Sequence, residues 1–424
     1  MLIYLVVVFI ALLVIGTPIA ICLGAASVFA LYYGSTFDMA LSAQRMYNSI
    51  FSFPLMAIPF FMLAGSLMEM GGISKRIIRF ADALIGHKRG GLAIAGILAC
   101  MIFAAISGSA VATVAAIGAI IIPEMVERGY SRKLATSTIS AAGITGPIIP
   151  PSTLFVLYAS IAGVSVTKMF LGGYIPGIMM GISLMFIVAY QARKENVPMA
   201  PKKTGKEILK ATRDAIWALL SPVIIMAGIL SGICTPTEAG AVGCLYSFII
   251  GVFVYKEMNF KSLVMALKES AISSTIIMFL IGTASIFSWV LTIERVPDMV
   301  TTLFTSLTDS RTVLLILITL LLFLVGMVLD SAPAMTMLVP VLLPMVKAYG
   351  IDPVFFGIIM TMNLCIGLLT PPVGTCLFVG CRVGKMQLTE LVKAIWPMLI
   401  ALIIVLLLCT FCEPIVMALP NLLS

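Results

Sequence analysis

The sequence carries little charge and almost no histidine. Only 10% of its 424 residues are charged, whereas 61% are hydrophobic, and the mean hydropathy is +1.17. Soluble domains carry about 25% charged residues, and a water-soluble fold of this composition could not cover its apolar surface. The apolar runs are long and continuous, without the alternation of barrel strands. The composition therefore predicts an all-α polytopic membrane protein.

Several kinds of chemical site are also missing. The only histidine, His87, lies in a Gly-His-Lys-Arg run that predicts a loop, and one histidine cannot build a metal centre. The sequence has no G-x-x-x-x-G-K-[ST] loop, so we expect no ATP site. Most of the nine cysteines lie in apolar runs and predict packing rather than disulfides. The first apolar run has no basic stretch before it, so we expect no cleavable signal peptide.

Two apolar segments are too long for one span of about 20 residues. Segment 92–122 has Ser107-Gly108-Ser109 at its middle, and segment 313–345 has Asp330-Ser331-Ala332-Pro333. We predict that each is a re-entrant helical hairpin, which enters the membrane, turns at mid-depth and leaves on the same side. The remaining apolar segments predict helices at 2–33 (one span or two), 50–70, 134–160, 170–190, 215–231, 237–255, 270–292, 354–380 and 391–412.

The basic residues indicate how the chain is oriented. If the first hairpin opens to the cytoplasm and the second to the opposite side, 21 of the 26 Lys and Arg residues are cytoplasmic, as the positive-inside rule requires. This bias accounts for the net charge of +8 without a nucleic-acid partner. The five basic residues left on the other side are Arg45, Lys168, Arg295, Arg311 and Lys347.

The two halves of the chain, on either side of a basic linker at 191–214, resemble each other. At a constant offset of 221 residues, Gly146 matches Gly367, and the pair Pro150-Pro151 matches Pro371-Pro372. All the matches are Gly or Pro, which set backbone geometry. Because the two hairpins would enter from opposite sides, the sequence predicts an inverted-topology repeat, a common plan of secondary transporters.

Each hairpin is followed by a helix that its Pro-Pro pair must break. The freed carbonyls cannot face lipid, so they must face a polar cavity or a cation. One such break would fit helix packing equally well, but two related breaks favour function. Carbonyl and hydroxyl oxygens suit a hard cation, and we predict two Na⁺ sites where hairpin tip and broken helix meet. The first comprises Ser107, Gly108, Ser109, Thr145 and Gly146, and the second Gly326, Asp330, Ser331, Gly367 and Thr370.

Three charged residues are candidates for substrate contact. Asp330 lies at mid-membrane depth, where a carboxylate costs about 2.5–3.5 kcal/mol and usually faces a pathway or partner. It could equally cap the second arm of its hairpin. Glu238 begins a helix near the outer surface, where capping competes with substrate contact. Arg295 could bind an anion but lies in an ordinary loop.

The four motifs together resemble the large membrane subunit of TRAP (tripartite ATP-independent periplasmic) transporters, over essentially the whole chain. They read Ser-Gly-Ser, Gly-Pro-Ile-Ile-Pro-Pro-Ser, Leu-Asp-Ser-Ala-Pro-Ala and Leu-Thr-Pro-Pro-Val-Gly. Within that family the chain is most similar to sialic acid transporters. With this resemblance, we assign substrate contact to Ser109, Pro150, Ser152, Thr153, Asp330, Glu238 and Arg295.

The resemblance implies a bacterial inner-membrane elevator transporter that is not an enzyme. Sodium would drive uptake of a small organic acid that a periplasmic binding protein delivers, and a separate small four-helix membrane subunit would stiffen the scaffold. The implied division is scaffold helices at 1–70 and 215–293, transport-domain halves at 91–190 and 313–424, a cytoplasmic connector at 71–90, the linker at 191–214 and a periplasmic connector at 294–312. The competing interpretation is a permease subunit of an ATP-driven importer.

Overall fold

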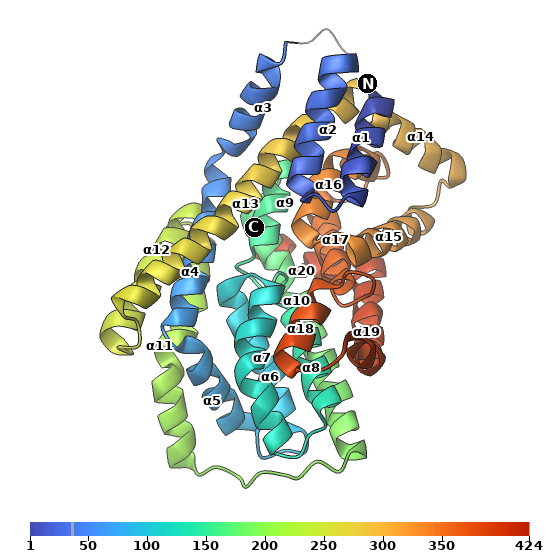
Figure 1. Ribbon diagram of the computed structural model, residues 1–424. Helices are drawn as coiled ribbons and strands as arrows, with labels where there is room; N and C mark the ends of the chain where they lie inside the picture. The colour runs from blue at the N-terminus through green and yellow to red at the C-terminus, as the bar shows by residue number, and fades with distance from the viewer. Residues whose placement is uncertain (35–37, 424) are drawn as a thin grey trace.

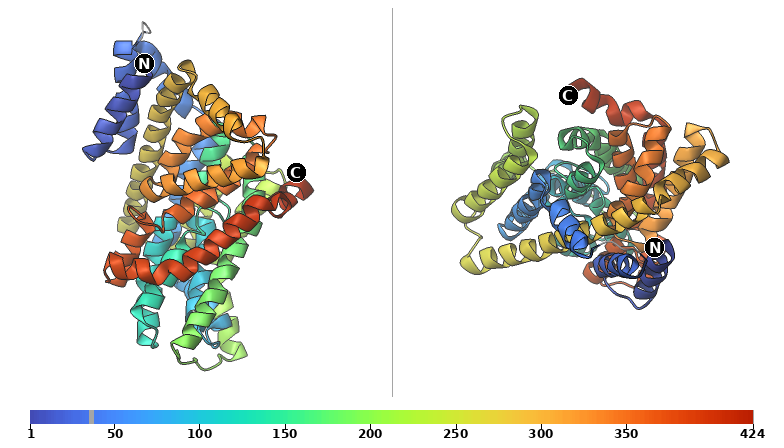
Figure 2. Two further views of the ribbon diagram at one scale, coloured as in Figure 1. Left: turned by 90° about the vertical axis from the view of Figure 1, so that its right-hand side faces the viewer. Right: turned by 90° about the horizontal axis from the view of Figure 1, so that it is seen from above.

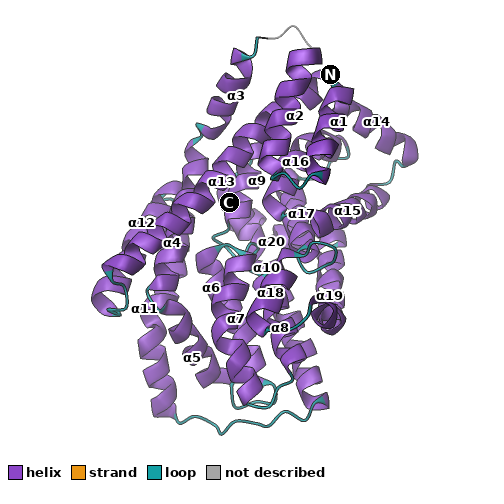
Figure 3. Ribbon diagram, in the orientation of Figure 1, coloured by secondary structure: helices purple, strands orange, loops and turns teal. Residues whose placement is uncertain are grey.

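The chain folds into helices joined by short connections (Figure 3). The computed structural model describes residues 1–34 and 38–423, and the regular structure of these residues is entirely helical. Nine of the helices within them are long and apolar enough to cross a membrane. The prediction of an all-α polytopic membrane protein is confirmed. The predicted units 1–70 and 313–424 include residues 35–37 and 424, which lie outside the described residues.

The helices of the first half precede the basic linker. They are α1 (Leu2–Val14), α2 (Ile19–Gly34), α3 (Ala40–Ile50), the 3-10 helix η1 (Phe53–Met56), α4 (Ala57–Met70), α5 (Ile73–Ile85), α6 (Gly91–Ser107), α7 (Ala110–Glu127), α8 (Arg132–Gly143), α9 (Thr153–Ala162) and α10 (Val166–Lys194). The first apolar run is two helices rather than one. They separate where Gly16 adopts a φ of 84° and Pro18 has no N–H to donate.

The helices of the second half follow the linker. They are α11 (Gly205–Leu230), α12 (Pro236–Ile249), the π-helix η2 (Ile250–Val254), α13 (Phe260–Ile293), α14 (Val296–Leu307), α15 (Arg311–Val328), α16 (Ser331–Ala348), α17 (Pro353–Gly367), α18 (Thr375–Gly384), α19 (Leu388–Phe411) and α20 (Glu413–Leu423).

The offset of 221 residues holds for whole helices. α7 begins at residue 110 and α16 at 331, and α8 begins at 132 and α17 at 353. The starts of α10 and α19 differ by 222 residues, 166 against 388. Both long apolar segments are hairpins, α6–α7 and α15–α16, and each is followed by a helix that a Pro-Pro pair divides. The predicted inverted repeat with two hairpins and two broken helices is confirmed.

The two hairpins turn by different means. In the first, Gly108 adopts a φ of 59°, which Gly tolerates readily. The Ser109 hydroxyl then accepts a hydrogen bond from the Ala112 N–H at 3.3 Å and caps α7. In the second, Leu329 and Asp330 are both extended, and the Asp330 carboxylate caps α16. A glycine is therefore needed at only one tip.

The broken helices join the two repeats into one unit. The second part of each broken helix packs against the other repeat (Figure 1). α9 of the first repeat packs against α16 and α17, and α18 of the second repeat packs against α7 and α8. The Tyr158 hydroxyl donates to the Pro353 carbonyl at 2.6 Å, and the Arg132 guanidinium donates to the Gly384 carbonyl at 3.1 Å. A movement of one hairpin unit would therefore carry the other with it.

Helices α4, α12 and α13 form a second layer beside this unit. α4 packs against both α12 and α13, and α13 also packs against α2 and α3. Figure 2 shows α1 and α2, in dark blue, at an edge of the molecule. The outward side chains are apolar, since Ile3, Leu320 and Ile404 are 78%, 56% and 53% exposed. An exposed apolar surface of this kind fits lipid rather than water.

Candidate functional site: two hairpin tips against two broken helices

The first hairpin tip touches the backbone of the first broken helix. A Cβ atom added at Gly146 would lie 3.0 Å from the Ser109 carbonyl oxygen. At the tip itself, a Cβ at Gly108 would lie 3.3 Å from the Thr153 nitrogen, and the Thr153 hydroxyl donates to the Gly108 carbonyl at 3.4 Å. The structure thus brings together predicted residues from both segments, and glycine permits the close approach.

A small network of hydroxyls holds this tip. The Ser107 hydroxyl lies 3.1 Å from the Thr113 hydroxyl, which donates to the Ser109 carbonyl at 2.7 Å. Thr113 is fully buried and was not predicted from the sequence. The only signal for it is a hydroxyl one helical turn after Ser109, a weak one in a helix rich in small residues.

The first helix break is buried and internally bonded. α8 ends at Gly143, and the Thr145 hydroxyl donates to the Ala142 carbonyl at 2.7 Å. The Ser152 hydroxyl donates to the Pro147 carbonyl and accepts from the Phe155 N–H at 3.3 Å, which caps α9. The Pro150-Pro151 peptide bond is cis, as is Pro371-Pro372 in the second break.

The second hairpin meets the second break even more closely. A Cβ at Gly367 would lie 2.6 Å from both the Cα and the carbonyl oxygen of Gly326, so the two backbones are in direct contact. The Val373 N–H donates to the Met327 carbonyl at 3.1 Å. The Thr370 hydroxyl donates to the Ile366 carbonyl at 3.1 Å. Two predicted residues, Gly326 and Gly367, therefore meet here, as Ser109 and Gly146 do in the first half.

Asp330 and Ser331 lie at the tip of the second hairpin. The Asp330 carboxylate accepts a hydrogen bond from the Ser331 N–H at 2.8 Å, and its side chain is otherwise exposed. Ser331 is buried, with its hydroxyl 4.0 Å from the Cys365 sulfur. Asp330 thus caps α16, and its exposed carboxylate keeps acceptor capacity for a ligand, since an ionised carboxylate has about four lone-pair sites.

A buried amide near the second break was not predicted. Asn363 on α17 is fully buried, and its Nδ2 donates to the Thr319 carbonyl at 3.0 Å. Its Oδ1 has no hydrogen-bond partner among the described residues. An unpaired buried oxygen costs about 1–3 kcal/mol, and it is available to a donor or a cation. The signal was present in the sequence, as an Asn four residues before Gly367 within an apolar run.

A cavity of about 320 Å³ lies between the first tip and the neighbouring helices α4 and α13. Ser107 and Ser109 line it from the tip, and Ser66, Ser270 and Ser273 add hydroxyls from the other side. Two carboxylates also line it, Glu69 from α4 and Glu269 from α13. Sequence reasoning missed both, although a carboxylate at the end of an apolar run was the available signal.

The remaining two predicted residues lie apart from this cavity. The Glu238 carboxylate accepts from the N–H and the hydroxyl of Thr235, both at 2.8 Å, in a capping box at the start of α12. Arg295 is the exposed residue before α14 and adopts a φ of 55°. Neither lines the cavity beside the first tip.

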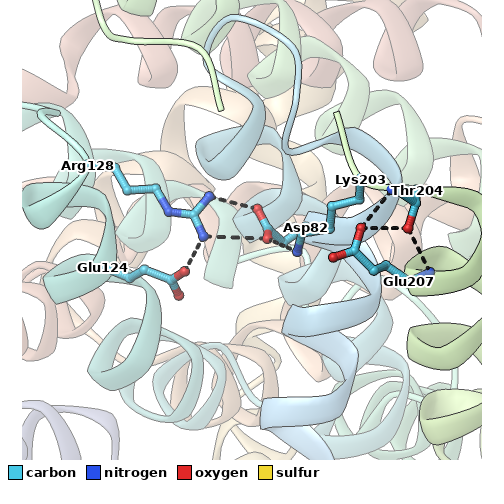
Figure 4. Close-up of polar contacts among 6 residues, drawn as sticks. All are labelled: Asp82, Glu124, Arg128, Lys203, Thr204 and Glu207. Atoms are coloured by element: carbon cyan, nitrogen blue, oxygen red, sulfur yellow. Dashed lines mark hydrogen bonds and ion pairs between the residues drawn. The ribbon is translucent and has the colours of Figure 1, made fainter. Parts of the chain in front are cut away.

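A second polar cluster ties the hairpin unit to the linker (Figure 4). The Asp82 carboxylate on α5 is buried and accepts from Arg128, just after α7, at 3.1 Å. The Lys203 ammonium of the linker donates to the same carboxylate at 2.6 Å. Arg128 also donates to Glu124 at 2.5 Å. One buried carboxylate therefore holds three segments together, and sequence reasoning did not single it out.

Known proteins match this chain over nearly its whole length. The family described as "Tripartite ATP-independent periplasmic transporter, DctM component" matches residues 6–415. The 2,3-diketo-L-gulonate TRAP transporter large permease protein YiaN of Escherichia coli is 42% identical over 388 residues, which are 92% of this chain and 91% of that protein. The C4-dicarboxylate TRAP transporter large permease protein DctM of Vibrio cholerae is 41% identical, covering 98% and 96%.

Two further likenesses extend the comparison. The isethionate TRAP transporter permease protein DctMQ of Oleidesulfovibrio alaskensis is 42% identical over 94% of this chain, which matches 63% of that longer protein. The Alcanivorax borkumensis YdaH transporter shares the fold, with a TM-score of 0.64 over 97% of this chain and 99% of that one, at 17% identity. From the family match and these identities, the chain is a multi-pass protein of the bacterial inner membrane and belongs to the large permease family of TRAP transporters.

Proposed function

We propose that this chain couples the uptake of a small organic acid to Na⁺ by an elevator movement of its hairpin unit. The observation that carries the proposal is the pair of junctions between tip and break, Gly146 against Ser109 and Gly367 against Gly326. Each junction sets a backbone carbonyl of a hairpin against the backbone of a helix break. Hydroxyl side chains are found in both segments nearby. Oxygen ligands of this kind suit hard cations.

The junctions also supply a reason for coupling. At the first junction the proposed ligands are Ser107, Ser109 and Thr145, and at the second they are Asp330, Ser331 and Thr370. A cation at either junction would neutralise converging carbonyl dipoles that otherwise repel, and so would favour a tip closed over substrate. Na⁺ and substrate would then each raise the affinity for the other, because coupling free energies are reciprocal.

The elevator movement is supported by how the layers are joined. The hairpins and broken helices pack together through α9 and α18, whereas α4 packs chiefly against α12 and α13. The two groups meet where α13 packs against α16 and where α4 packs against α6 and α9. α5 packs against both α11 and α6, so it connects the two groups. The cavity lined by Glu69 and Ser109 lies between them, as expected of a site that one group moves past the other.

The partners and the substrate class rest on the family. The relatives are named for 2,3-diketo-L-gulonate, C4-dicarboxylates and isethionate, which are small organic anions. We therefore propose a small organic acid as the substrate, with sialic acid one member of the panel to be tested. A periplasmic binding protein and a small membrane subunit complete the proposed transporter.

The test is uptake by proteoliposomes that contain this chain, the small membrane subunit and the binding protein. Labelled sialic acid and C4-dicarboxylates would be supplied with an inward Na⁺ gradient, with K⁺ in its place, or with Na⁺ on both sides. We expect uptake only with the Na⁺ gradient, and little uptake by this chain alone. Uptake that requires ATP and ignores the gradient would support the ATP-driven importer, and robust uptake by the chain alone would contradict the tripartite assembly.

A further inference from the structure

A second cavity, of about 710 Å³, lies between α5 and the first turns of α11, and no residue of either hairpin tip lines it. Five of the side chains lining it are basic and two are acidic, so its lining carries a net charge of +3. The basic residues are Arg76, Arg79, Lys203, Lys210 and Arg213, and the acidic ones are Glu207 and Asp214. The uncharged residues of the wall are Ala83, Ala211, Trp217, Val254 and Tyr255.

Part of this wall is held in place by its own contacts. Arg76 pairs with Glu257 at 2.8 Å, and its guanidinium lies 3.7 Å from the centre of the Tyr255 ring. The Tyr255 hydroxyl donates to the Asp214 carbonyl at 3.0 Å. Lys203 is paired with Asp82. These contacts therefore fix the part of the wall that Arg76, Tyr255 and Lys203 form.

Three of the cations that line the cavity have no partner among the residues that the structure describes. The side chains of Arg79, Lys210 and Arg213 are exposed, and none has a hydrogen bond or ion pair within residues 1–34 and 38–423. They face the cavity from two helices, α5 and α11. Together they leave uncompensated positive charge in a concave site, which attracts an anion.

The cavity lies at the level where α11 changes from polar to apolar. Charged residues end at Asp214, and from Ala215 to Leu230 the helix carries none. Trp217 and Tyr255 mark this boundary, as aromatic side chains do at membrane interfaces. Just beyond it, Val254 and Ile224 are 41% and 37% exposed. By the positive-inside rule this end of the molecule faces the cytoplasm.

We propose that this cavity binds a phosphate-bearing anion, presented as the headgroup of an anionic phospholipid of the cytoplasmic leaflet. The phosphate would lie among Arg79, Lys210 and Arg213, beside the stacked Arg76. The acyl chains would descend along Trp217 and the exposed apolar side chains of α11. A site shared by α5 and α11 would thus anchor these helices to the bilayer while the hairpin unit moves.

The test measures lipid binding to the purified full chain in neutral detergent by native mass spectrometry and by the shift in thermal unfolding midpoint. The ligands are short-chain phosphatidylglycerol, zwitterionic phosphatidylcholine and inorganic phosphate. The variants are Lys210→Gln alone and the triple Arg79→Gln, Lys210→Gln, Arg213→Gln. The matched control removes the same charges from other exposed positions, in the triple Arg193→Gln, Arg382→Gln, Lys393→Gln.

We expect wild-type and control chains to bind phosphatidylglycerol and to be stabilised by it, but not by phosphatidylcholine. Each cation near a membrane surface is worth roughly fivefold in affinity, so the single variant should lose about fivefold and the cavity triple at least tenfold. An equal loss in the control triple would overturn the site in favour of general surface charge. Displacement of the lipid by equimolar inorganic phosphate would overturn the lipid as the source of the anion. The single variant keeps the test decisive if the triple does not fold.

Discussion

Adding one methyl group at Gly367 should separate the second hairpin from its broken helix. A Cβ there would lie 2.5–2.6 Å from the carbonyl carbon, Cα and carbonyl oxygen of Gly326. All three are backbone atoms, so no side-chain rotation can relieve the clash, and α15 and α17 must move apart. The proposed second Na⁺ site depends on this backbone contact, so Gly367→Ala should disturb that site directly.

The magnitude follows from packing energetics. An extra methylene in a closely packed region typically costs about 1–3 kcal/mol. If the ion-bound state bears this cost, Na⁺ affinity in Gly367→Ala should fall by roughly 5–150-fold. Gly146→Ala should cost less, because its Cβ would lie 3.0–3.1 Å from the Ser109 backbone. Gly228→Ala is the matched control, since a Cβ in that helix meets only Cys234, at 3.6 Å.

The assay is the Na⁺ concentration that gives half-maximal uptake in proteoliposomes with the partner proteins. Thermal unfolding in Na⁺-free detergent separates a local change from a loss of fold. The expected order of effect is Gly367→Ala, then Gly146→Ala, with Gly228→Ala unchanged. Wild-type Na⁺ dependence in a folded Gly367→Ala protein would refute the placement of an ion site at this junction.

Three further outcomes are expected. Asp330→Asn keeps the shape of the side chain and its capping oxygen but removes the charge. The variant should insert into the membrane normally, while its transport rate falls at least about tenfold. Wild-type uptake by this variant would show that Asp330 is only a helix cap. In a Cys-less background, a cysteine at the exposed position Lys168 should be labelled only from the periplasm and one at the exposed position Arg89 only from the cytoplasm. The reverse pattern would contradict the inverted topology. Asp82→Asn should lower the free energy of unfolding by about 1–3 kcal/mol. This is less than the roughly 3–5 kcal/mol expected on breaking a fully buried ion pair, because the Arg128 side chain is a third exposed. A double-mutant cycle with Arg128→Gln would show no coupling if the contact contributes nothing.

The features that the sequence predicted well are those that local chemistry determines. The turn at Gly108 and the breaks at Pro151 and Pro372 follow from residues that constrain the backbone wherever they occur. The hairpins followed from length, because the segments 92–122 and 313–345, of 31 and 33 residues, are each too long for one span. Such signals do not depend on what packs against them.

The features that the sequence could not supply depend on partners distant in the chain. The crossing of α9 and α18 between the repeats joins residues such as Arg132 and Gly384, and no local pattern encodes that pairing. Asp82 appeared to be one charge in a basic connector, and only the fold shows Lys203 beside it. Site residues of this kind become visible once tertiary neighbours are known.

The two tips differ in where their negative charge resides, and this bears on the proposed cycle. Asp330 belongs to the second tip, so in the proposed elevator movement its charge would travel with the hairpin unit. The first tip has only hydroxyls and carbonyls, and the nearest carboxylates in its cavity, Glu69 and Glu269, belong to α4 and α13. If those helices stay fixed, a cation at the first tip has these carboxylates nearby in one position of the unit and loses them in another. The second site would then hold its ion throughout the cycle, whereas the affinity of the first would depend on position, which is what release of an ion on one side of a membrane requires.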